Sequence, residues 1–101
     1  MTEPLVFDGS EGTVTVTAGA LTELIARAAR SVEGARVRRP KRSIEIHHGD
    51  GRASVELELG ARYGVPLPEL ARAVQERVAE ALGQVSGLEV ERVDVLLEEV
   101  A

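Results

Sequence analysis

The sequence contains no cysteine and no tryptophan, and it has one phenylalanine and one tyrosine. Without cysteine the chain cannot form a disulfide, a thiolate nucleophile or a cysteine-ligated zinc site. No apolar run approaches the roughly 18 residues that a membrane-spanning helix requires. The first residues, MTEPLVFDGSEG, have neither the basic nor the apolar region of a secretory signal peptide. We therefore expect a cytoplasmic protein whose association with a membrane would depend on a partner.

The charges of the chain are unevenly distributed. Its 101 residues suffice for one domain, and the net charge of -5 disfavours nonspecific binding of nucleic acid over the whole surface. Five of the twelve basic residues nevertheless lie within residues 36–42, which we call the basic segment. These residues are Arg36, Arg38, Arg39, Lys41 and Arg42. We predict that they form an interaction site, either for anionic lipid headgroups or for an acidic segment of a partner.

The hydrophobic pattern predicts two strand–helix–strand units. Strict alternation predicts strands over 13–17, 43–47 and 52–59, and a closing strand that ends near residue 100 and has either a bulge or a late start near residues 91–92. Helical periodicity predicts one helix over 18–31 and a longer one after Pro66 and Pro68. The apolar stripe of the longer helix comprises Leu70, Val74, Val78, Leu82 and Val85. Between the units, Pro40 is expected to exclude regular helix from the basic segment.

This order predicts an α+β fold, a two-layer β-α-β-β-α-β sandwich. We expect a four-stranded, mostly antiparallel sheet with two helices on one face. We expect residues 1–12 to form a flexible N-terminal tail and residues 13–101 to form a single domain. The uncovered face of the sheet should be polar and acidic. It is expected to carry Thr13, Thr15, Glu45, His47, Glu56, Glu58 and Asp94.

No group of residues predicts a catalytic, cofactor or metal site. Adjacent residues of a strand point to opposite faces, so His47 and His48 cannot chelate one ion together. Glu45 shares the face of His47, and Glu56 or Asp50 would have to complete a metal site there. Carboxylates on an open sheet face also lack the burial that acid–base catalysis uses. We therefore expect a protein that is not an enzyme and binds no cofactor.

Three segments of the chain resemble the alkaline shock protein family, also called the Gls general-stress family of bacterial envelope-stress proteins. The segments are GTVTVTAGALTELIARAARSVEGA, ASVELELGARYGVPLPELARAVQERVAEAL and SGLEVERVDVLLEEV, which together span about residues 12–100. The closing strand of this family usually carries Val-Asn-Val, whereas this chain has Asp94 at the asparagine position.

The resemblance implies a non-enzymatic stress protein of the bacterial cell envelope that acts through protein–protein interaction. It also implies tethering to the membrane by a small partner protein and a tendency to self-associate, and it supplies no catalytic residues. The basic segment leaves an alternative open, which is a nucleic-acid-binding module that uses this loop. The strand RASVELEL weakens that alternative, because it has no aromatic residue on which a base could stack.

Overall fold

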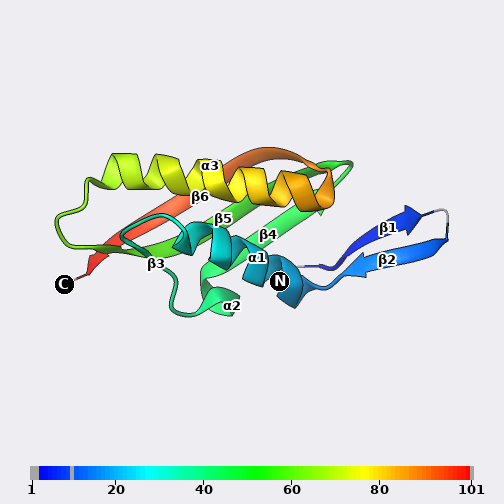
Figure 1. Ribbon diagram of the computed structural model, residues 1–101, viewed down its shortest axis with the longest axis horizontal. Helices are drawn as coiled ribbons and strands as arrows, with labels where there is room; N and C mark the ends of the chain where they lie inside the picture. Colours follow the sequence, from blue (N-terminus) through cyan, green and yellow to red (C-terminus); the bar gives the residue numbers. More distant parts are fainter. Residues whose placement is uncertain (1–2, 10, 101) are drawn as a thin grey trace.

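Two helices cover one face of a mixed four-stranded sheet, and a separate hairpin extends from the body of the molecule (Figure 1). The computed structural model describes residues 3–9 and 11–100. The strands are β1 (Leu5–Gly9), β2 (Gly12–Val16), β3 (Ala35–Arg36), β4 (Ile44–Gly49), β5 (Arg52–Arg62) and β6 (Glu89–Val100). The helices are α1 (Ala18–Arg30), α2 (Pro40–Ser43) and α3 (Leu67–Ser86). The predicted α+β class, with its four-stranded sheet, is confirmed.

Strand β5 is the centre of the sheet. Strand β6 pairs with it in parallel over its whole length, from Arg52 to Arg62. On the other side of β5, β4 pairs antiparallel with its first half and β3 pairs antiparallel with residues near its end. Two parallel neighbours need a crossover connection, and α3 supplies it between β5 and β6.

The expected first strand of the sheet, at 13–17, does not join the sheet. It forms β2, which pairs antiparallel with β1 in a sheet of its own, with Phe7 opposite Val14. No place remains for it beside β5, because β6 occupies one side of β5 while β4 and β3 occupy the other. The division of the chain into a tail and a domain remains a prediction, although the expected tail contains strand β1.

Helix α3 buries the stripe that its sequence indicates, with one exception. Leu70, Val74, Val78 and Leu82 are each at most 3% exposed. The prediction for Val85 is wrong, because this side chain is 48% exposed. The buried row advances by four residues at each step and therefore reaches Ser86.

Three local features of the backbone have clear causes in the sequence. Asp50 and Gly51 have φ angles of 53° and 75°, as the two-residue turn of a hairpin requires. Gly87 ends α3 in the left-handed conformation, with φ of 70°. In β6 the register shifts between the partners of Ala53 and Ser54, so that Glu91 is the extra residue of a bulge.

The end of α3 provides a test of these helix faces. The Leu82 side chain is only 1% exposed. Leu82→Ala should therefore lower the free energy of unfolding by about 2–5 kcal/mol, because it leaves a cavity in the core. Val85→Ala, three residues away, should change it by no more than about 0.5 kcal/mol. Urea denaturation measures the free energy of unfolding of both variants. Equal losses of stability would contradict the assignment of Leu82 to the buried face and Val85 to the exposed face.

Candidate interaction surface

The basic segment lies on the surface of the molecule. All five of its charged side chains, those of Arg36, Arg38, Arg39, Lys41 and Arg42, are exposed. Within the part of the chain that the structure describes, none of them forms an ion pair or a side-chain hydrogen bond. Their charges are therefore available to an anionic partner, and their role as an interaction site remains a prediction.

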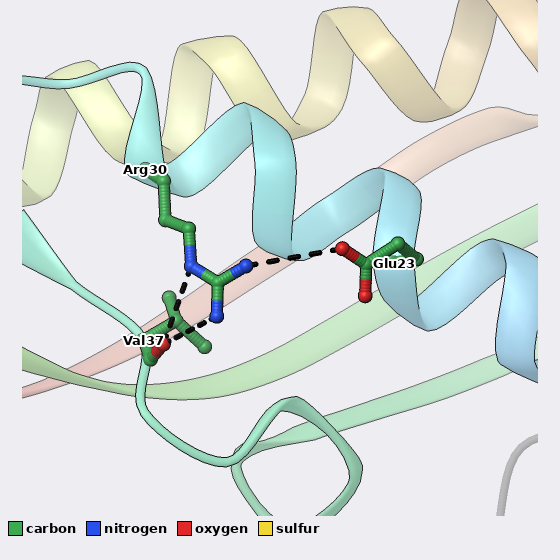
Figure 2. A network of polar contacts seen from close by, with 3 residues as sticks. All are labelled: Glu23, Arg30 and Val37. Carbon is green, nitrogen blue, oxygen red and sulfur yellow. Dashed lines mark hydrogen bonds and ion pairs between the residues drawn. The ribbon is translucent and has the colours of Figure 1, made fainter.

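The backbone of the basic segment is held in place although its cations are exposed. Strand β3 ties the start of the segment to Gly60 and Ala61 of β5. Val37 is only 6% exposed and belongs to the hydrophobic core. Figure 2 shows Arg30 of α1 donating two hydrogen bonds to the carbonyl oxygen of Val37, from Nη2 at 2.6 Å and from Nε at 3.2 Å. The same guanidinium lies 3.8 Å from the carboxylate of Glu23, so one side chain joins α1 to the loop.

Pro40 does not exclude helix from the basic segment, contrary to the prediction. It is the first residue of the four-residue helix α2. Proline is tolerated at this position because the first N–H groups of a helix have no partner within the helix. The N–H groups of Arg42 and Ser43 bond to the carbonyl oxygen of Arg39 at 3.0 and 2.9 Å. This turn places Lys41 and Arg42 beside α1.

The uncovered face of the sheet carries a row of carboxylates. Glu45 of β4 pairs with Glu56 of β5, which in turn pairs with Asp94 of β6. Arg92 binds Asp94 with an N–O distance of 2.7 Å. The expected contribution of Thr13 and Thr15 to this face is wrong, because β2 lies outside the sheet.

Leu96 also lies on the uncovered face and is 64% exposed. It pairs with Glu58, which follows Glu56 on the same face of β5. The sequence analysis did not assign Leu96 to this face, although its alternation with Asp94 in β6 gives a signal for it.

Glu45, His47 and Glu56 approach one another on this face. Each offers one ligand atom within 4.8 Å of the others, and the Nε2 atom of His47 lies 3.6 Å from a carboxylate oxygen of Glu45. Asp50 does not belong to this group. All three side chains are exposed, and exposed acidic groups are common without an ion. The group does not by itself identify a metal site, and the absence of a bound metal remains a prediction.

Two adjoining grooves of about 370 and 420 Å³ lie where α2 meets the start of α1. Gly19, Thr22, Lys41 and Arg42 line both of them. The sequence analysis did not identify these grooves, because they depend on the packing of two helices that are separated along the chain. Among the helices in residues 3–9 and 11–100, none combines the length and the apolar character of a membrane span.

The contact between Arg30 and Val37 can be tested. Arg30→Gln should destabilise the fold by about 1–2 kcal/mol, because a part-buried carbonyl group loses two hydrogen bonds. Amide hydrogen exchange at Arg42 and Ser43, whose N–H groups are hydrogen-bonded, should also become faster. Arg27→Gln on the same helix is the control, since the side chain of Arg27 has no hydrogen bond or ion pair with any described residue. Exchange that is unchanged in Arg30→Gln would show that this side chain does not hold the loop.

Comparison with known proteins places these surfaces in context. The model of the alkaline shock protein family, described as having a cell envelope-related function, matches residues 32–101. A search of curated proteins found no match. Among solved structures, a copper form of a MamM CTD variant has 18% identity and a TM-score of 0.55, and covers 82% of this chain and 98% of its own. A cadmium form has 19% identity and the same TM-score, covering 82% and 96%. These likenesses support the fold.

Proposed function

The chain belongs to the alkaline shock protein family, whose function is cell envelope-related, and we propose that it is a non-enzymatic protein that acts at the envelope by binding other proteins. The observation that carries this proposal is the basic segment. It displays five exposed cations from a backbone that Val37, Arg30 and β3 hold in place. A surface whose backbone is already ordered loses less conformational entropy when a partner binds.

The proposed partner is a small membrane-anchoring protein that presents acidic groups to the basic segment. The chain itself would then reside in the cytoplasm and reach the membrane through this partner. Each cation near an anionic membrane contributes about 1 kcal/mol, so the segment would assist the attachment without replacing the partner. This contact would weaken with salt, because exposed charges are screened within about 10 Å at 0.1 M ionic strength.

Self-association belongs to the same proposal. The carboxylate row of the open sheet face and the basic segment adjoin each other, since Arg42 and Glu45 line the same groove of about 420 Å³ on that face. A surface that carries both charges can pair with a second copy across a two-fold axis, each segment meeting the other copy's acidic row. Sedimentation velocity at low and high salt measures this association.

Absence of catalysis is also part of the proposal. Its support is the exposed setting of Glu45, Glu56 and Asp94, which lie on an open face and not in a closed cleft. Acid–base catalysts are usually found where burial and neighbouring charges shift the pKa of a carboxyl group.

Capture of the partner tests the proposal. The chain purified from the membrane fraction of its host should bring down a membrane protein, and the double variant Arg38→Ser, Arg39→Ser should lose most of it. The matched control is Arg27→Ser, Arg72→Ser, which removes the same charge from the two long helices. Equal capture by both variants would contradict a role for the basic segment. Salt-sensitive copurification of RNA in place of a protein would favour the nucleic-acid alternative.

A further inference from the structure

Thr22 is a buried polar residue whose hydroxyl group has no partner among the described residues. Its side chain belongs to α1 and is 7% exposed, yet it forms no hydrogen bond with any of them. Other hydroxyl groups in helices do form such bonds. Ser86 of α3 and Ser31, which caps the C-terminus of α1, each donate to a helix carbonyl oxygen at 2.6 Å. Within residues 3–9 and 11–100 no fully buried side-chain oxygen lacks a partner, so the Thr22 hydroxyl retains some exposure, and Thr22 lines both grooves.

The start of α1 faces the same grooves. This helix has 13 residues, and Thr17 caps it by accepting a hydrogen bond from the N–H of Ala20 at 3.1 Å. The N–H groups of Ala18 and Gly19 have no partner within the helix. Its first turn contains no acidic residue, so the positive end of the helix dipole is not compensated there. Gly19 lines both grooves, and an added Cβ at this position would meet open space.

The charge around the grooves favours an anion. Lys41 and Arg42 line both grooves and Arg39 lines one of them. Two carboxylates oppose these cations, one in each groove, and both have other neighbours. Glu23 lies 3.8 Å from Arg30, and Glu45 lies 3.6 Å from His47. Three cations, a helix N-terminus and a hydroxyl group with no partner among the described residues therefore line these two adjoining grooves.

We propose that this site between the first turn of α1 and helix α2 binds a phosphate oxyanion, either free or as a phospholipid headgroup. Lys41 and Arg42 would supply positive charge, while the Thr22 hydroxyl and the Gly19 N–H would donate hydrogen bonds to separate oxygens. The inference rests on the proposed contact of the basic segment with an anionic surface. It adds a defined headgroup chemistry and a residue, Thr22, that lies outside the segment.

Binding of inorganic phosphate to the full chain, measured by calorimetry at low ionic strength, tests the site. Thr22→Val keeps the volume of the side chain and removes its hydroxyl group, and it should weaken binding by about tenfold. Ser31→Ala is the matched control, because it removes a hydroxyl group from the end of the same helix, outside both grooves. A thermal melt of each variant verifies that it is folded. Equal affinity of Thr22→Val and the wild type would overturn the proposal.

Vesicles distinguish the two sources of the phosphate group. Phosphatidylcholine vesicles with and without phosphatidic acid are sedimented with the wild type and with Thr22→Val, in the presence and absence of free phosphate. Binding that requires phosphatidic acid, is displaced by phosphate and is weakened in Thr22→Val assigns the site to a headgroup. Phosphate binding that depends on Thr22 without vesicle binding assigns it to the free ion. Vesicle and phosphate binding that are both independent of Thr22 would overturn this site and leave the general role of the basic segment intact.

Discussion

The parallel pairing of β5 with β6 is the constraint on which the rest of the fold depends. It runs along the whole of β5 and takes up one of the two sides of that strand. Because the two strands run in the same direction, the chain must return across the sheet, and α3 makes this crossover while burying its apolar row. The other side of β5 then remains for β4 and for the short strand β3. The hairpin of β1 and β2 lies outside this sheet.

The same constraint shapes the two charged surfaces. Helices α1 and α3 cover one face of the sheet, so the row of Glu45, Glu56 and Asp94 is left uncovered on the other. The short β3 ends early on its side of β5, and the chain then passes through the basic segment before β4 begins. Arg30 and Val37 tie that passage to α1, as Figure 2 shows, while the cations of the basic segment remain exposed. Charge segregation in the sequence thus becomes an arrangement of adjoining acidic and basic surfaces.

The grooves beside α1 show how packing against another helix makes the N-terminus of α1 a candidate site for an anion. Thr17 satisfies one of the free N–H groups of the helix, and others remain near Gly19. Because α2 packs against this turn, Lys41 and Arg42 come close to an N-terminus that already favours negative charge. Thr22, which lines both grooves, adds a neutral hydroxyl donor beside these cations.

The sequence by itself determined those features that depend only on neighbouring residues of the chain. The turn at Asp50 and Gly51, the helix end at Gly87 and the buried row from Leu70 to Leu82 follow from backbone preferences and from the 3.6-residue period. The apolar alternation of β6 also changes phase near Glu91, and the pairing with β5 shows that a bulge, and not a late strand start, is the cause. The exposure of the five basic residues followed from their charge.

Only the tertiary structure decided which strands share the sheet. Alternation shows that residues 13–16 form a strand but does not select β1 as its partner, because a period of two residues carries no information about which strand lies alongside. The site beside α1 has the same origin. Thr22 looks like an ordinary helix residue in the sequence, and it becomes a candidate ligand only when α2 packs against it from some 20 residues away, a contact that no local pattern encodes.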